Sequence, residues 1–108
     1  MDITVIICVY NGASTIIKAI NSIDVPECPI LIINDDSDDN TLELLQKHPS
    51  KQLKIVSHKI NKGLSSARQT ALDHLETDYG IWLDADDEFL PGRIKNLYKC
   101  LDKNNFDL

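Results

Sequence analysis

The chain has 108 residues, of which 43% are hydrophobic and 26% are charged, the composition of one globular domain or part of one. Its net charge of −6 excludes sequence-independent binding to nucleic acid, because no basic stripe offsets the acidic groups. The three cysteines include no closely spaced pair and suit a reducing cytosol. The apolar residues 3–9 are too few to cross a membrane.

Four short apolar stretches alternate with four segments in which apolar residues recur at helical spacing. The apolar stretches predict buried strands over residues 3–9, 30–33, 53–58 and 79–83. The segments between them predict helices that begin near Ala13, after the loop 34–40, near Leu64 and at Pro91. The first helix is expected to be capped by Asn11 or Ser14. The residues 106–108 are expected to begin a further strand.

Four successive strand–helix units predict a parallel sheet with helices on both faces, a Rossmann-like three-layer α/β/α fold over residues 1–108. Right-handed crossovers then favour the strand order 3-2-1-4. Ligands of such folds bind at the carboxyl ends of the strands. That edge is expected to gather Tyr10, Asn11, Asp35, Asp36, Arg68, Asp84 and Asp86.

The stretch from Tyr79 to Glu88 leads from an apolar strand directly into Asp84, Asp86 and Asp87. Carboxylates packed this closely repel one another unless a cation compensates them. Oxygen ligands of this kind suit Mg²⁺ or Mn²⁺, so one interpretation is a site for a metal-bound diphosphate. The other interpretation is a solvated acidic loop that caps the next helix.

The side chains expected at this edge match the parts of a nucleoside diphosphate. The ring of Tyr10 can stack on a planar base, an Asp can accept from a base N–H, and Arg68 can donate to a carbonyl or a phosphate. The sequence has neither a GxGxxG nor a GxxxxGKS/T motif, so a dinucleotide fingerprint and a P-loop are excluded. A phosphate ligand would therefore need a metal.

Simpler interpretations stand beside these. Tyr10 is also explained as an aromatic residue at a strand end, Arg68 as a surface cation, and helix capping alone would account for Asp38 and Asp39. The remaining reactive side chains are expected to be structural or solvated (His48, His58 and His74) or part of the core (Cys8, Cys100 and Trp82).

Four segments carry a resemblance: VIICVYN at 5–11, IINDDS at 32–37, NKGLSSAR at 61–68 and LDADD at 83–87. Their order and spacing resemble the N-terminal, nucleotide-binding half of a family 2 glycosyltransferase with the GT-A fold. The loop after residue 34 departs from the family pattern, because it lacks the usual glycine and is one residue short. The resemblance implies that the acceptor site and the general base lie beyond residue 108.

The resemblance also implies roles for the matching positions on the base side of the site. Tyr10 resembles the residue that stacks on the donor base, and Asn11 belongs to the same matching segment. Asp36, with Asp35 beside it, resembles the acid that reads the base edge. Arg68 resembles the basic residue that approaches the base or the phosphates.

On the metal side, Asp84 and Asp86 resemble the DxD motif of the family. The resemblance places Asp84 nearer the ribose and makes Asp86 a ligand of Mn²⁺ or Mg²⁺, and Asp87 could share either task. In the family, the metal neutralises the leaving nucleoside diphosphate.

The expected function is a metal-dependent, inverting transfer of a sugar from a nucleotide donor, a UDP-sugar by the resemblance, to a glycan or lipid-linked acceptor. We expect a cytoplasmic location, at the inner face of a membrane, an isolated chain without activity, and self-association through exposed apolar surface. One alternative is a non-catalytic nucleotide-binding half-domain. Another is a phospho-acceptor signalling domain, whose acidic pair would follow the first strand, where this chain has Tyr10 and Asn11.

Overall fold

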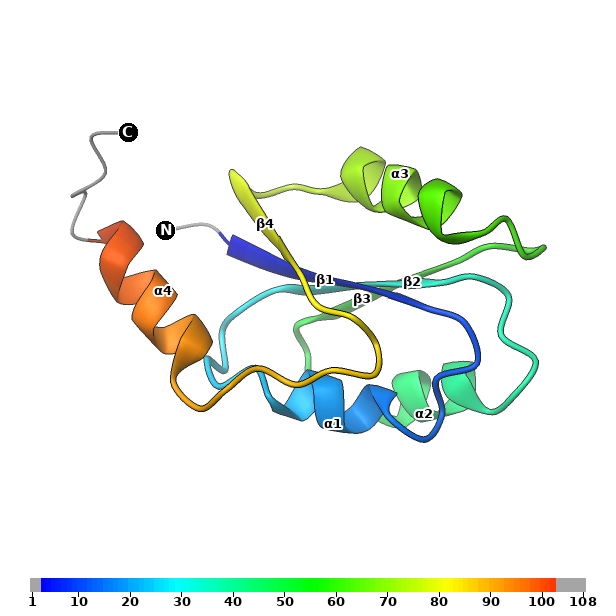
Figure 1. The fold of residues 1–108 in the computed structure, drawn as a ribbon, viewed down its shortest axis with the longest axis horizontal. Helices are drawn as coiled ribbons and strands as arrows, with labels where there is room; N and C mark the ends of the chain where they lie inside the picture. Colours follow the sequence, from blue (N-terminus) through cyan, green and yellow to red (C-terminus); the bar gives the residue numbers. More distant parts are fainter. Residues whose placement is uncertain (1–2, 103–108) are drawn as a thin grey trace.

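Strands and helices alternate along the residues 3–102 that the computed structural model describes (Figure 1). The strands are β1 (Ile3–Val9), β2 (Ile30–Asn34), β3 (Leu53–Ser57) and β4 (Tyr79–Trp82). The helices are α1 (Ile16–Asn21), α2 (Thr41–Lys47), α3 (Leu64–His74) and α4 (Arg93–Asp102). The strand expected at 106–108 lies outside the described residues.

The strands form one parallel sheet in the order β3-β2-β1-β4, which confirms the predicted order 3-2-1-4. The two central strands are almost completely buried, as expected for β-branched runs covered by helices on both faces. The edge strands β3 and β4 are much more exposed.

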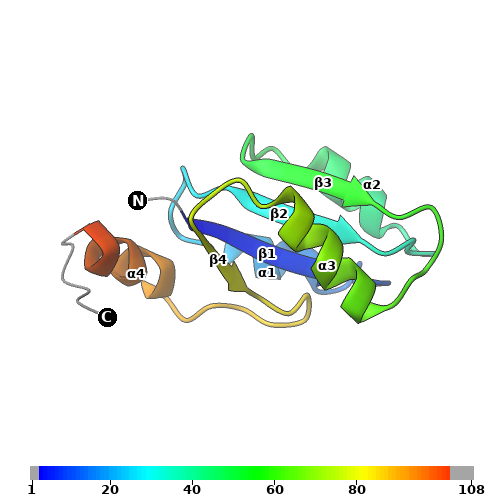
Figure 2. The same ribbon diagram turned by 90° about the horizontal axis from the view of Figure 1, so that it is seen from above.

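Helices α1 and α2 cover one face of the sheet and α3 covers the other, which confirms the three layers (Figures 1 and 2). Alternate residues of β1 point to opposite faces. Val5, Ile7 and Val9 pack with α1, α2 and the start of α4, whereas Ile6 packs with Ala67 and Ala71 of α3 in a second, smaller cluster.

The carboxyl edge of the sheet is stepped. Val9 pairs with Asn34 and Asn34 with Ser57, so β1, β2 and β3 end at one level. The last residue of β4, Trp82, pairs with Ile6, three residues before Val9. At about 3.3 Å per residue, the chain leaves β4 about 10 Å short of the end of β1. The turn after β4 therefore has room to run alongside the end of β1.

Two helix starts differ from the sequence prediction. Helix α1 begins at Ile16, and its N-cap, Thr15, makes no side-chain capping bond, so the predicted start near Ala13 and the predicted caps are wrong. Helix α4 begins at Arg93, because Gly92 has a φ of 82° and so interrupts any helix started at Pro91.

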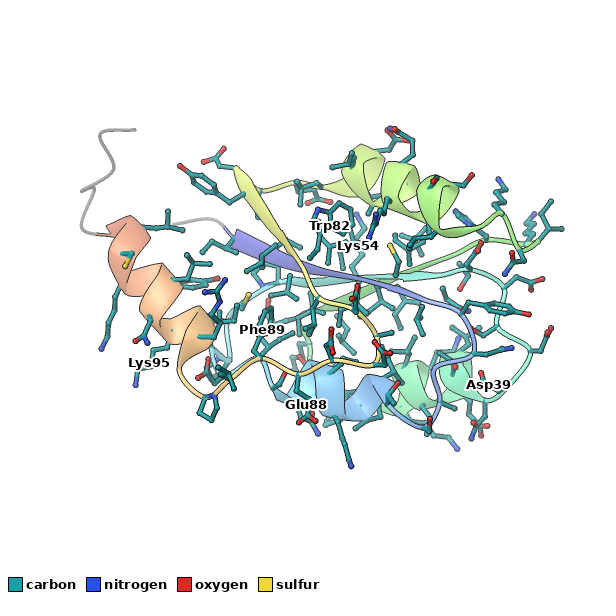
Figure 3. The ribbon with its side chains drawn as sticks, in the orientation of Figure 1. Asp39, Lys54, Trp82, Glu88, Phe89 and Lys95 are labelled. Atoms are coloured by element: carbon teal, nitrogen blue, oxygen red, sulfur yellow. The ribbon has the colours of Figure 1, made fainter. Side chains whose placement is uncertain are left out.

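Trp82 and Cys100 are exposed, so their prediction as core residues is wrong. Trp82 projects from an edge strand toward the α3 side, opposite to Phe89 (Figure 3), and 44% of its surface is exposed. Cys8 is half-buried and packs against the cluster under α3. Between residues 3 and 102, none of the helices has the length and apolar character that crossing a bilayer requires.

Candidate functional site

The segment Tyr10–Gly12 leaves β1 at the carboxyl edge and is bonded to the loop that follows β2. The Tyr10 hydroxyl donates to Oδ2 of Asp38 at 3.1 Å. The Asn11 amide donates to Oγ of Ser37 at 2.9 Å, and Oδ1 of Asn11 accepts from the Asp38 amide at 2.7 Å. The structure therefore brings the two loops together, as expected for neighbouring parallel strands.

Asn11 and Asp36 both adopt the left-handed backbone region, with φ angles of 53° and 58°. Asn and Asp tolerate this region better than other non-glycine residues. Such conformations cost free energy and concentrate at functional sites. Each of the two loops thus holds one strained residue at the candidate site.

Gly12 is fixed by close packing on both sides. A Cβ atom at this position would lie 2.5 Å from Cγ2 of Val9 and 3.8 Å from Cβ of Ala85. The Gly12 amide also donates a buried bond of 3.0 Å to Oγ1 of Thr41. Because Ala85 lies beside Gly12, the acidic turn after β4 and the segment Tyr10–Gly12 are neighbours.

Asp39 links the start of α2 to the loop before α1. Its carboxylate accepts from the hydroxyl and the amide of Thr41 and from the amide of Ala13 at 3.1 Å. The Thr41 hydroxyl bond, together with these amides, holds the pKa of Asp39 below its ordinary value. Asp39 therefore does more than the capping that the sequence suggested.

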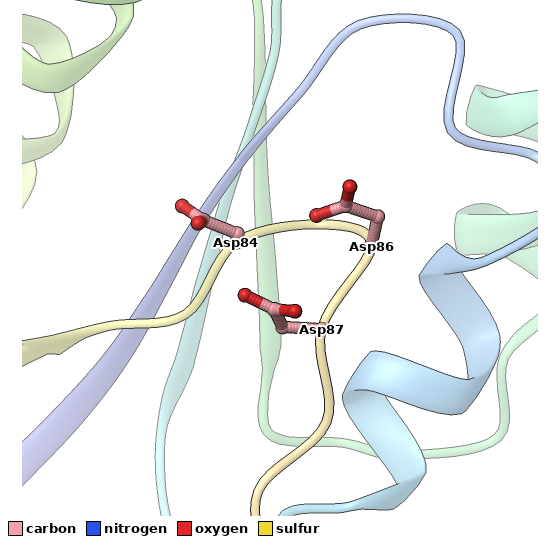
Figure 4. Close-up of side chains that lie close together, drawn as sticks. All are labelled: Asp84, Asp86 and Asp87. Atoms are coloured by element: carbon pink, nitrogen blue, oxygen red, sulfur yellow. The ribbon is translucent and has the colours of Figure 1, made fainter.

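Asp84, Asp86 and Asp87 lie on one exposed turn, which an Asp87 amide bond to the Asp84 carbonyl closes at 3.0 Å. One carboxylate oxygen from each residue lies within 4.8 Å of the others (Figure 4). Within residues 3–102, no ion pair or hydrogen bond compensates these three carboxylates. Their hard oxygen atoms fit the preferences of Mg²⁺ and Mn²⁺.

A pocket opens on the α3 side of the carboxyl edge. Its lining includes Tyr10 and Cys8 from the end of β1, Asp35 after β2, and Asn61 and Gly63 before α3. Tyr10 is 48% exposed, so much of its ring is free to contact a ligand. The pocket and the acidic turn consequently flank the same segment, Tyr10–Gly12.

Asp35 is buried at the base of this pocket and its carboxylate is fully bonded. Oδ1 accepts from Nδ1 of His58 at 2.7 Å and from the Lys62 amide at 2.9 Å, and Oδ2 accepts from the Gly63 amide at 2.8 Å. Burial alone would raise the pKa of Asp35, but the Lys62 amide, His58 and the Gly63 amide together lower it below its ordinary value.

Asp36 differs from its neighbour, although the two are chemically identical. Asp36 is half-exposed. The pKa of the Tyr10 phenol is raised mainly by Asp38, and the nearby Asp36 carboxylate makes a smaller contribution in the same direction. No hydrogen bond to the Asp36 carboxylate is found between residues 3 and 102. Its oxygen atoms are thus available to a ligand, whereas those of Asp35 are engaged.

Arg68 lies on the exposed side of α3, with its guanidinium 5.6 Å from the ring centroid of Trp82. This is the geometry of a cation–π contact. Arg68 also interacts electrostatically with Cys8, which lines the pocket. The structure places Arg68 beside the pocket, and its contact with a base or phosphate stays a prediction.

Sequence reasoning missed the parts that connect these loops. The sequence patterns did not point to Thr41. His58 was expected to be solvated or structural, and the structure favours the second, because its side chain is buried against Asp35, a contact that was not predicted. All seven residues from Asn34 to Asn40 are polar, which is more than the capping of one short helix requires. This excess could have indicated that the loop bonds to its neighbours.

The sheet order 3-2-1-4 is that of a Rossmann-like fold, and the superposition on the TarS structure reported below identifies it as the GT-A class of this fold. Residues 4–108 match the profile of Glycosyl transferase family 2, and the chain belongs to this family.

Three relatives illustrate the match. The chain is 33% identical to a cholesterol galactosyltransferase of Borreliella burgdorferi, over 98% of this chain and 31% of that protein. S. aureus TarS 1-349 in complex with UDP-GlcNAc superposes with a TM-score of 0.86 at 27% identity, over 95% of this chain and 32% of TarS.

The third, mannosyltransferase PcManGT from Pyrobaculum calidifontis in complex with GDP-Man and Mn²⁺, shares the fold with a TM-score of 0.77 at 24% identity, over 97% of this chain and 32% of that one. The chain thus spans about a third of the length of these proteins.

Proposed function

We propose that this chain forms the donor-binding part of a glycosyltransferase that transfers a sugar, with inversion and with a divalent metal, from a nucleoside diphosphate to an acceptor. One observation carries the proposal: the pocket that Tyr10 lines and the turn that holds three carboxylates flank the same segment, Tyr10–Gly12. A nucleotide whose base enters the pocket would direct its diphosphate toward that turn.

On the base side, Tyr10 stacks on the nucleobase and Asp36 accepts from a base N–H group, because its carboxylate has no hydrogen-bond donor within residues 3–102. Asn11 orients this loop through Oδ1. Asp35 shapes the pocket by holding the amides of the loop before α3. Arg68, the nearby cation, donates to the base or the phosphates.

On the diphosphate side, Asp86 and Asp84 hold the metal, with Asp84 also near the ribose, and Asp87 adds a third carboxylate. The three carboxylates have no compensating cation within residues 3–102, which favours a divalent ion at this turn. When bound, Mn²⁺ or Mg²⁺ supplies charge neutralisation for the leaving diphosphate.

UDP-sugars are the first donors to test, because TarS, at 27% identity, is described with UDP-GlcNAc. The name of the cholesterol galactosyltransferase supports a lipid acceptor, alongside the glycan acceptors expected from the sequence. A lipid-linked acceptor would place the protein on the cytoplasmic face of a membrane.

The second candidate is a non-catalytic nucleotide-binding half-domain. The chain covers only 31% to 32% of the length of these relatives. This coverage favours the half-domain for the chain taken alone. Both candidates predict UDP binding, and only the first predicts turnover once the remaining parts are supplied. We expect the 108-residue chain to bind UDP-GlcNAc without hydrolysing it, as measured by UDP release in Mn²⁺.

Calorimetry with UDP, with and without Mn²⁺, tests the site itself. Asp86→Ala should abolish the Mn²⁺-dependent part of the affinity, a loss of about tenfold or more, or about 1.4 kcal/mol. Glu88→Ala is the matched control, since it removes the same charge one residue beyond the cluster. Equal Mn²⁺ dependence in the Asp86→Ala and wild-type proteins would contradict the assignment.

Self-association is supported by the surface around β4. Leu72, Tyr79 and Trp82 are 53%, 47% and 44% exposed, and β4 has no partner on its outer edge within residues 3–102. Exposed apolar residues and open strand edges promote association. Light scattering should show oligomers that Trp82→Ser reduces, and a monomer at high concentration would contradict this proposal.

A further inference from the structure

The buried side chain of His58 connects β2 to α3 through both of its ring nitrogen atoms. Nδ1 lies 2.7 Å from Oδ1 of Asp35, and Nε2 lies 2.8 Å from Oγ1 of Thr70. The side chains of His58 and Asp35 are only 7% and 6% exposed. Asp35 has been given a role in shaping the pocket, whereas His58 has none so far.

The hydrogen bonds around His58 fix the orientation of its ring. The Asp35 carboxylate accepts from two backbone amides and acts as an acceptor toward Nδ1, so Nδ1 donates. Nε2 faces the Thr70 hydroxyl, which can accept from Nε2 or donate to it. The ring is therefore held from both sides, by β2 and by α3.

The pair holds one wall of the pocket. Asp35 accepts from the amides of Lys62 and Gly63, and its backbone carbonyl accepts from Nδ2 of Asn61 at 3.2 Å. Gly63, the N-cap residue of α3, has a φ of 90° and no side chain, so the Asp35 carboxylate supplies the acceptor for the amides that precede the helix. Asn61 and Gly63 line the pocket itself.

We propose that His58 is a positioning residue, held between Asp35 and Thr70, that fixes the Asn61–Gly63 wall of the nucleotide pocket. The role in binding rests on the proposed function, whereas the anchoring of the wall does not. His58 acts through Asp35 and need not touch the ligand. Its loss should loosen the wall and weaken nucleotide binding without altering the acidic turn.

Asp35 faces His58 directly from the end of β2. Cys8 of β1 interacts electrostatically with Asp35 and with Arg68 of α3. The amides of Lys62 and Gly63 report on the link between His58 and Asp35, because they share the Asp35 carboxylate with His58.

NMR of the 108-residue chain without ligand is the first test. The Lys62 and Gly63 amides should be protected from hydrogen exchange in the wild-type chain, because the Asp35 carboxylate holds them. His58→Leu should lose much of this protection, and His58→Asn, whose Nδ2 can still donate to Asp35, should keep most of it. Equal protection of the two amides in the wild-type and His58→Leu proteins would overturn the proposal.

UDP affinity by calorimetry is the second test. His58→Leu should weaken UDP binding about tenfold, the loss typical of removing a group that orients a binding side chain. His58→Asn, whose Nδ2 can still donate to Asp35, should recover most of it. His48→Leu is the control, because His48 is remote from the pocket lining and bonds to Asn21.

The outcomes separate the two proposals. Affinity that is unchanged in a folded His58→Leu protein, or that is not recovered in His58→Asn, would overturn the positioning role. Thr70→Val, which removes only the second bond, gives a further variant if His58→Leu does not fold. Absence of UDP binding by the wild-type chain would instead refute the proposed function, and hydrogen exchange at the Lys62 and Gly63 amides would still decide whether His58 holds the wall.

Discussion

The two sides of the carboxyl edge are built in opposite ways. On the β2 side, the loop after Asn34 is bonded throughout to its neighbours, and Asp35 and Asp39 accept several hydrogen bonds each. On the β4 side, the exposed carboxylates of the turn 84–87 lie close together with no compensating group in the described part of the chain. The first side is organised by its own hydrogen bonds, whereas the second is where we propose that a cation binds.

This contrast separates two uses of aspartate. A carboxylate surrounded by donors stabilises the fold, and its pKa falls. Carboxylates that face one another in solvent do not stabilise the fold and become favourable only when a cation joins them. Substitutions on the β2 side should therefore change stability, and substitutions on the β4 side should change ligand binding.

The largest effect is expected for Asp35→Ala. It leaves the His58 ring and the amides of Lys62 and Gly63 without their acceptor, and each donor left unsatisfied in a buried place costs about 1–3 kcal/mol. Urea unfolding of the purified chain measures this loss. Asp78→Ala, on the surface, should stay within about 0.5 kcal/mol of wild type. Equal stability of the two variants would show that the Asp35 carboxylate does not stabilise the fold.

A smaller effect, on binding alone, is expected for Tyr10→Ala. Loss of one stacking contact should weaken UDP binding about tenfold and leave the fold intact. Tyr10→Phe keeps the ring and loses only the bond to Asp38, so its affinity should remain near that of wild type. Calorimetry distinguishes the two variants, and a loss of the same size in both would assign the effect to the hydroxyl.

The smallest effect concerns pH. Because the folded-state pKa of Asp35 is depressed, its contribution to stability is complete above the unfolded value of about 3.9 and is lost as pH falls through the folded value. Asp39 should add less, since it is exposed. Urea midpoints should therefore fall less steeply below about pH 4 in Asp35→Asn than in wild type. Parallel curves would show that Asp35 does not titrate as described.

The sequence predicted the central half of the fold well, because β1 and β2 are apolar runs whose length and β-branched residues leave few alternatives. The same signal failed at the edge, since Trp82 belongs to an apolar run and is nevertheless exposed on β4. Apolar character cannot tell a central strand from an edge strand when the covering layer is a single helix.

The candidate site was predicted as a set of residues and not as a set of roles. Topology was sufficient to bring Tyr10 and Asn11 to the loop after β2. Asp35 and Asp36 are indistinguishable in the sequence, and their different roles follow from the φ of 58° at Asp36 and from the position of His58. Both features depend on tertiary contacts, which local patterns do not encode.

Paramagnetic NMR with Mn²⁺ and UDP tests most directly whether the pocket and the acidic turn form one site. Traces of Mn²⁺ added to the UDP-saturated chain should broaden the amide signals of residues 84–87 and of Tyr10–Gly12, and should leave those of α4 near Lys99 sharp. The same Mn²⁺ should broaden neither segment in Asp86→Ala. Broadening that omits both segments, or that affects the whole chain equally, would contradict a shared nucleotide and metal site.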